Sequence, residues 1–209
     1  MRELVMVGYE FFCVAIFAFL AYGILRRIYK KKGLEQRPGQ FILLLVLTLY
    51  VTGVFHVTGA GTIYHIRQYG LKASTTQLNL IPFSDPDIDL VSYLLNIVLL
   101  IPLGFLLPLI WPEMNRLSRI FCFGASFSLL IEASQMLNLR NSDVDDLLLN
   151  TLGAIIGWLL FLVLSKRSKG AGKPVTGRQY EAILYFAVMY LGYFLLFNEF
   201  GAAKILYGF

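Results

Sequence analysis

Charged residues are scarce in this chain. Asp, Glu, Lys and Arg together make up only 15% of its 209 residues, whereas hydrophobic types reach 57%. A typical soluble domain carries about 25% charged residues. The shortage of charge therefore argues against a soluble protein and indicates a membrane protein.

Cysteine and histidine are also rare. Cys13 and Cys122 both lie in apolar runs, which predicts small buried side chains and no disulfide framework. His56 and His65 are nine residues apart without a ligand-like spacing, so we interpret each as a hydrogen-bonded histidine. The sequence contains no phosphate-cradling loop, no CxxC pair and no serine–histidine motif. It thus lacks three common sequence signatures of a catalytic or binding site.

Long apolar runs are what the sequence has in place of charge. A hydrocarbon core about 30 Å thick needs roughly 20 apolar residues in a helix. Six segments fit this length, namely 4–25, 41–60, 90–111, 119–137, 147–164 and 180–200. We therefore expect an all-α, polytopic bundle of about six transmembrane helices. No small-residue cleavage site follows the first run, so we expect a retained helix rather than a cleaved signal peptide.

The connections between these runs are short, and none is long enough to form a soluble domain. We expect three parts: a first helix with a basic loop (1–40), a transmembrane core (41–165), and a basic linker with the last helix (166–209). In the connection before the third run, Asp85 followed by Pro86 predicts the N-cap and first residue of a helix.

Lys and Arg are distributed unevenly between the two sides of the predicted bundle. Three connections, 26–40, 112–118 and 165–179, together with Arg119 at an edge, hold thirteen of the eighteen. The positive-inside rule makes this side cytoplasmic and places both termini outside the cytoplasm. Because the basic residues cluster at span ends, the net charge of +5 indicates contact with lipid headgroups and not with nucleic acid.

Polar residues concentrate in one stretch, "IEASQMLNLRNSDVDDLLLN" (131–150), at the predicted outer ends of the fourth and fifth spans. Five residues recur from there at intervals of three, four, three and four: Asp143, Asp146, Asn150, Gly153 and Gly157. At about 100° per residue they share one helical stripe, whereas Asp145 points to the opposite side. Because glycines let a neighbouring helix approach closely, we expect this stripe to face the interior of the bundle.

Further polar residues reach the same depth from other segments. Glu132 and Gln135 share one face of the fourth span, and Asn96 lies early in the third. An ionisable residue at membrane depth is costly, so Glu132 predicts a functional site. We expect its carboxylate within about 4 Å of Arg67 or Arg140, as in an ion pair.

A purely structural explanation covers part of this pattern. Ser142 followed by Asp145 is a capping-box spacing, and acids in a first turn complement the helix dipole. This explains the aspartates of the stretch without any function. It does not explain Glu132, Gln135 or Asn150, which lie deeper, although a structural ion pair of Glu132 with an arginine stays open.

The same residues carry a family resemblance. The R-x-x-D-x-x-D-x-x-x-N-x-x-G-x-x-x-G spacing and the E-x-x-Q before it are specific, and the matching runs are "NLIPF" (79–83), "NIVLLIPLGF" (96–105), "IEASQ" (131–135) and "RNSDVDDLLLNTLGAIIG" (140–157). Over roughly residues 40–165 the chain resembles the VanZ-like family of small bacterial membrane proteins. The resemblance implies a bacterial plasma membrane and a link to resistance against the glycopeptide teicoplanin. It implies no particular reaction.

The first functional hypothesis is a resistance or envelope factor with a polar site facing the extracytoplasmic leaflet. It would bind an anionic or sugar-bearing envelope lipid, a lipid-linked cell-wall intermediate or a lipoglycopeptide. Arg67 and Arg140 would engage phosphate or carboxylate, and the substrate-binding set would also include the amides of Asn96, Gln135 and Asn150.

Two other hypotheses stay open. A membrane-embedded enzyme could use Glu132, Asp143 and Asp146 to hold a divalent cation through oxygen ligands, or use one raised-pKa carboxyl as general acid or base. A small transporter is the third. Transporters usually need polar groups near the midplane, whereas the inner halves of these spans are nearly all apolar.

The topology can be tested by labelling introduced cysteines in intact cells with a membrane-impermeant thiol probe. Because the thirteen basic residues should hold their side in the cytoplasm, a cysteine at Asn141 should react. Cysteines at Lys31 and Lys169 should not. The opposite labelling pattern would move the polar stretch to the cytoplasmic side and contradict all three functional hypotheses.

Overall fold

The computed structural model describes residues 1–33, 39–70, 78–84, 90–140, 142–165 and 179–208. Three sequence predictions fall on other positions: the helix start at Asp85 and Pro86, the labelling site at Asn141, and the basic linker within 166–178. These lie outside the described residues.

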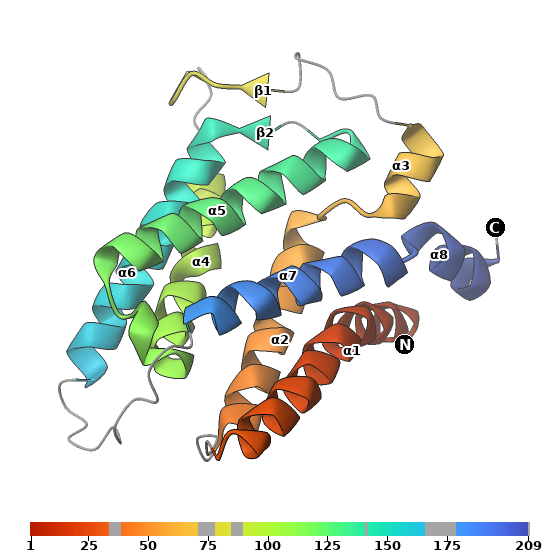
Figure 1. Ribbon diagram of the computed structural model, residues 1–209. Helices are drawn as coiled ribbons and strands as arrows, with labels where there is room; N and C mark the ends of the chain where they lie inside the picture. The colour runs from red at the N-terminus through yellow and green to blue at the C-terminus, as the bar shows by residue number, and fades with distance from the viewer. Residues whose placement is uncertain (34–38, 71–77, 85–89, 141, 166–178, 209) are drawn as a thin grey trace. The chain divides into compact units, whose positions relative to one another are not determined.

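Helices dominate the described residues (Figure 1). They are α1 (Arg2–Lys31), α2 (Gln40–Thr58), α3 (Ile63–Tyr69), α4 (Leu90–Ile110), α5 (Leu117–Gln135), α6 (Val144–Ser165), α7 (Gln179–Leu196) and α8 (Glu199–Tyr207), with 3-10 turns η2 (Pro112–Met114) and η3 (Met136–Asn138). Two short strands, β1 (Leu78–Asn79) and β2 (Ser142–Asp143), pair in parallel. Five helices are long and apolar enough to cross a membrane, and the bent pair of α7 and α8 raises the number to six. The prediction of an all-α bundle with about six spans is confirmed.

The last predicted span is not one continuous helix. It breaks between α7 and α8, which are bent by 50°. The side chain of Asn198 accepts a hydrogen bond from the Gly201 N–H at 2.9 Å and so caps α8. The hydroxyl of Tyr9 donates to the Leu196 carbonyl and accepts from the Asn198 N–H at 3.1 Å. These contacts satisfy backbone groups that a broken helix leaves unpaired.

The chain packs into two compact units. Unit 1 consists of Met1–Leu71 and Ile183–Phe209, and unit 2 of Lys72–Ala182. Unit 1 therefore contains α1, α2, α3, α8 and most of α7, while unit 2 contains α4, α5, α6 and both strands (Figure 1). The three-part division at residues 40 and 165 stays a prediction.

Unit 2 is held together by a close approach of α4 and α6. A Cβ atom added at Gly153 or Gly157 of α6 would overlap the backbone carbonyl oxygens of Ile97 and Ile101 on α4. In the opposite direction, a Cβ at Gly104 of α4 would overlap the α6 backbone. Helix axes can lie this close only where side chains are missing, so the stripe of small residues on α6 faces α4.

This contact predicts that Gly153→Ala destabilises the protein. The added methyl group has no room between the two backbones, so the free energy of unfolding should fall by about 1–3 kcal/mol. Gly53→Ala is the matched control, because a Cβ there meets no atom within 4 Å and alanine favours helix. Thermal unfolding in detergent measures both variants. Equal stability of Gly153→Ala and the parent chain would contradict the close packing of α4 against α6.

Candidate functional site

Polar side chains of unit 2 gather where α4 begins, α5 ends and α6 begins. The pairing of β1 with β2 sets Asn79 opposite Asp143 and so ties the loop before α4 to the start of α6. We call the following residues the polar cluster: Asn79, Tyr93, Asn96, Ser128, Glu132, Ser142, Asp143, Asp145, Asp146 and Asn150. They come from all three long helices of the unit and from both strands.

Glu132 lies in the last turn of α5 and is only 4% exposed. Its Oε2 atom accepts hydrogen bonds from the Ser142 hydroxyl at 2.8 Å and from the Asp143 N–H at 3.3 Å. The η3 turn and Leu139, with a φ of +64°, bring the chain back over the end of α5. The carboxylate therefore finds its donors in the segment that follows its own helix.

Of the two arginines that we expected as partners of Glu132, Arg67 or Arg140, the structure excludes an ion pair with Arg140. Arg140 is exposed, and no such pair occurs in this part of the chain. The hydroxyl and the N–H of β2 occupy the place that we assigned to a guanidinium. Arg67 belongs to unit 1 and is exposed there, with its guanidinium carbon 5.4 Å from the centre of the Tyr64 ring.

Asp145 also differs from its prediction, since it does not point away from the cluster. It is 2% exposed and accepts hydrogen bonds from the Phe83 N–H at 2.8 Å and from the Tyr93 hydroxyl of α4. Asp143 accepts from Asn79 at 3.1 Å and from the Asp145 N–H at 2.9 Å. The helical stripe could not show this, because the donors come from another helix and from a loop.

The remaining stripe residues face the neighbouring helices. Asp146 accepts a hydrogen bond from the amide of Asn96 on α4. Asn150 is 2% exposed and donates to the Ser128 hydroxyl of α5 at 3.0 Å. Its Oδ1 atom is buried and has no hydrogen-bond partner among the described residues. Gln135, the last residue of α5, is half-buried at the same end.

The cluster is rich in hydrogen-bond acceptors. Asp143 and Asp146 lie close enough to Glu132 for their charges to act on it, and Arg140 is close enough to Asp146 to offset part of this charge. Among the residues that the structure describes, no three His, Cys, Asp or Glu side chains are placed to hold a metal ion. Glu132, Asp143 and Asp146, which we considered as ligands of a divalent cation, do not form such a group among the described residues.

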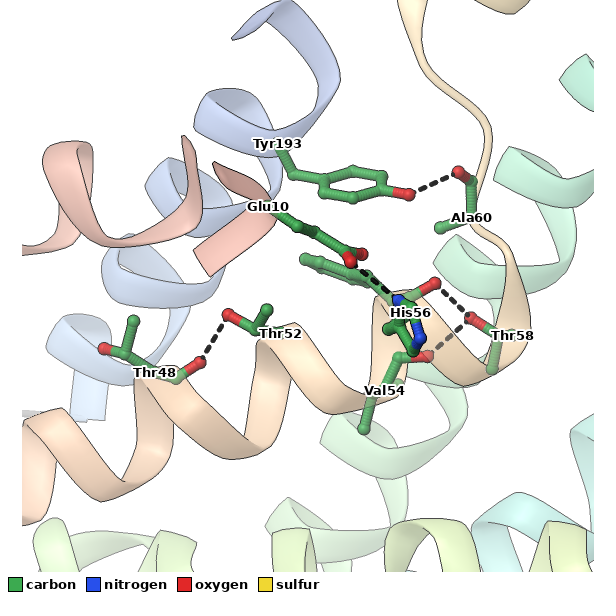
Figure 2. Close-up of polar contacts among 9 residues, drawn as sticks. Glu10, Thr48, Thr52, Val54, His56, Thr58, Ala60 and Tyr193 are labelled. Atoms are coloured by element: carbon green, nitrogen blue, oxygen red, sulfur yellow. Dashed lines mark hydrogen bonds and ion pairs between the residues drawn. The ribbon is translucent and has the colours of Figure 1, made fainter. Parts of the chain in front are cut away.

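Unit 1 contains a second polar feature, which the sequence analysis missed. Glu10 of α1 is buried, and its carboxylate lies 2.8 Å from Nδ1 of His56 on α2 (Figure 2). His65 of α3 lies 3.5 Å from the carboxylate of Glu199 on α8. A lone acid within an apolar run was the available signal for Glu10. The histidines were expected to be hydrogen-bonded, and both are. His56 pairs with a residue 46 positions away, whereas His65 contacts both Glu199, 134 positions away, and its neighbour Thr62, whose N–H it accepts at 3.1 Å.

The sequence pattern of the VanZ/LLP1 family matches residues 41–165, which include α4, α5, α6 and the whole polar cluster. No curated protein and no solved structure matches the chain. The family match covers more than half of the sequence. Five helices of the described residues are long and apolar enough to cross a membrane. This chain is therefore a multi-pass membrane protein that belongs to the VanZ/LLP1 family.

Proposed function

We propose that this protein is an envelope factor whose polar cluster binds the headgroup of an extracytoplasmic lipid or lipid-linked cell-wall intermediate. One observation carries the proposal. Glu132 is a buried carboxylate whose described partners are a hydroxyl and a backbone N–H, both neutral. A buried charge without a basic partner is expensive in a membrane helix and is kept for a function more often than for stability.

The free atoms of the cluster indicate which ligand groups would fit. Both described hydrogen bonds to Glu132 use Oε2, and the one to Asp146 uses Oδ1. The second oxygen of each carboxylate and the unpartnered Oδ1 of Asn150 are hydrogen-bond acceptors. Acceptors bind donors, so the ligand should present hydroxyl or amino groups, as a sugar or an aminated headgroup does.

The acceptors of the cluster and the exposed Arg140 would bind different groups of the ligand. Arg140 is exposed at the same end of unit 2 and near Asp146, where its guanidinium would engage a phosphate or carboxylate of the ligand. Gln135 and Asn96 would add amide hydrogen bonds. The role of Arg67 in this binding stays a prediction from the sequence.

Resistance to teicoplanin or a related lipoglycopeptide would follow from such binding if the ligand is also the one that the antibiotic needs. This step rests on the family resemblance and on the predicted orientation, which places the polar cluster outside the cytoplasm. Occupancy of the lipid by this protein would then reduce the amount that the antibiotic reaches.

A membrane-embedded enzyme is the second candidate, and the proximity of the acids favours it. Glu132 has Asp143 and Asp146 as acidic neighbours. When carboxyl groups lie close together, one can hold a proton while another stays ionised, which is the arrangement of a general acid and base. The two candidates differ in whether the bound lipid is changed.

The proposal predicts that Glu132→Gln loses bound lipid without unfolding. A charge-assisted hydrogen bond is worth about 1.5–3 kcal/mol, so lipid retention should fall about tenfold or more. Arg140→Gln should behave similarly. Mass spectrometry of lipids that copurify with the full-length protein measures this loss, and teicoplanin susceptibility of cells producing each variant measures protection.

Glu3→Gln and Arg116→Gln are the matched controls, since both residues are exposed and lie outside the cluster. They should keep lipid and protection. If Glu132→Gln folds normally and keeps both, the binding proposal is wrong. Conversion of the lipid by the purified parent protein, lost in Glu132→Gln, would support the enzyme instead.

Tyr93→Phe separates scaffold from site within the same cluster. The Tyr93 hydroxyl donates to buried Asp145, which also holds the loop through the Phe83 N–H. Removing this donor to a carboxylate should lower the free energy of unfolding by about 1.5–3 kcal/mol. Lipid retention per folded molecule should stay unchanged, as measured by the same mass spectrometry. Loss of lipid at unchanged stability would assign Asp145 to binding rather than to support of the loop.

A further inference from the structure

Unit 1 buries a carboxylate that the polar cluster of unit 2 does not involve. Glu10 lies in the apolar α1 and is 2% exposed, yet the side chain of its partner His56 is 54% exposed. The Glu10 Oε2 atom and the His56 Nδ1 atom are 2.8 Å apart (Figure 2). The imidazole therefore extends from a buried acid to the surface of the protein.

Neighbouring helices cover Glu10, and its partner His56 is the residue that reaches the surface of the protein. A Cβ at Gly192 of α7 would overlap the carbonyl oxygen of Cys13 on α1. The two helices therefore pack closely one turn C-terminal to Glu10. Tyr193, the next residue, is buried and donates to the Ala60 carbonyl at 2.8 Å (Figure 2). Within the part of the chain that the structure describes, the carboxylate of Glu10 has His56 as its only hydrogen-bond partner.

The charges that face this pair limit its protonation states. The titratable groups around Glu10 are His56 of α2, Glu199 of α8, and Tyr193 and Cys13 from α7 and α1. Glu199 also acts on His56 and is itself paired with His65 of α3. Of the described groups around Glu10, only His56 can carry a positive charge.

A low-dielectric surrounding favours forms of the pair with no net charge. Two such forms exist. In one, an imidazolium faces a carboxylate; in the other, a neutral imidazole faces a carboxylic acid. Each holds one proton more than the form in which only the carboxylate is charged, and the two differ by the position of a proton along the 2.8 Å contact.

We propose that Glu10 and His56 form a proton-exchange site in the membrane part of unit 1. A proton taken up at Nε2 of the half-exposed His56 imidazole gives the imidazolium. Transfer of the Nδ1 proton to Oε2 of Glu10 leaves a carboxylic acid and a neutral imidazole that is protonated at Nε2. Release is the reverse of these steps, and no bonds other than N–H and O–H bonds form or break.

The residues that precede His56 on α2 indicate that the proton is released through His56, the residue that takes it up. Thr52 and Thr48 lie four and eight residues before His56 and are buried. The Thr52 hydroxyl donates to the Thr48 carbonyl at 2.9 Å (Figure 2), and the Thr48 hydroxyl donates to the Leu44 carbonyl at 2.7 Å. Leu44, at the next step, is buried and apolar. The polar stripe ends there, which favours uptake and release at the His56 end over passage through the bundle.

The proposal is tested by infrared difference spectroscopy on the full-length protein in phosphatidylcholine vesicles. Between about pH 8 and pH 5, the range in which histidine acts as a proton carrier, the parent protein should gain a carboxylic-acid C=O band. Glu10→Gln should lose the part of this band that comes from Glu10, whereas Glu132→Gln should keep that part. Glu3→Gln, which removes an exposed acid from the same helix, should keep it. The measurement needs no lipid ligand, so its outcome is independent of the function proposed for unit 2.

An identical pH-dependent carboxyl signal in Glu10→Gln and the parent protein would overturn the proposal and make the pair a fixed structural tie. If Glu10→Gln fails to fold, nitrogen-15 spectra of histidine-labelled parent protein provide the second measurement. The chain has only two histidines, and His65→Gln identifies the signals of His56. Those signals should change between the same two pH values, and constant signals would equally overturn the proposal.

Discussion

Hydrocarbon offers no hydrogen bonds, so a polar group that these helices bury is costly unless it finds a partner within the protein. The buried acids show how strongly this constraint shapes the structure. Asp145 is satisfied by a loop N–H and by a tyrosine of another helix, Glu132 by the strand after its own helix, and Glu10 by a histidine of α2. Each acid therefore links its own helix to another segment of the same unit.

The polar contacts of unit 2 depend in turn on a contact that has no polar side chain. Gly153 and Gly157 let the α6 backbone approach α4 closely, and three residues before Gly153 the same helix carries Asn150. One further turn back, Asp146 meets Asn96 of α4. If α4 stood a methyl group farther away, this hydrogen bond would lengthen beyond its normal range. The glycines therefore set the geometry of the cluster without taking part in its chemistry.

The sequence predicted the features that depend on the spacing of residues and on the length of apolar runs. It missed those that depend on hydrogen-bond partners distant in the sequence. Apolar run length located the membrane helices, and the three–four spacing located the face of α6 that meets α4. The break between α7 and α8 was missed because Tyr9, which satisfies it, is 189 residues from Asn198. Asp145 was assigned to the wrong side because a helical projection counts angles only. Glu132 was given an arginine partner since charge complementarity is visible in a sequence, whereas the return of the chain over α5 is not.

The partner of a buried carboxylate decides what that carboxylate can do. Ser142 and a backbone N–H cannot accept the proton of Glu132 at any ordinary pH, so they hold the acid in place, which fits the ligand binding that we propose for its second oxygen. An imidazole can exchange a proton with Glu10 and with water. Two acids that look alike in the sequence, each within an apolar run, thus led us to two different proposals: binding of a donor group in unit 2 and exchange of a proton in unit 1. The difference lies in the donors that folding brings to them.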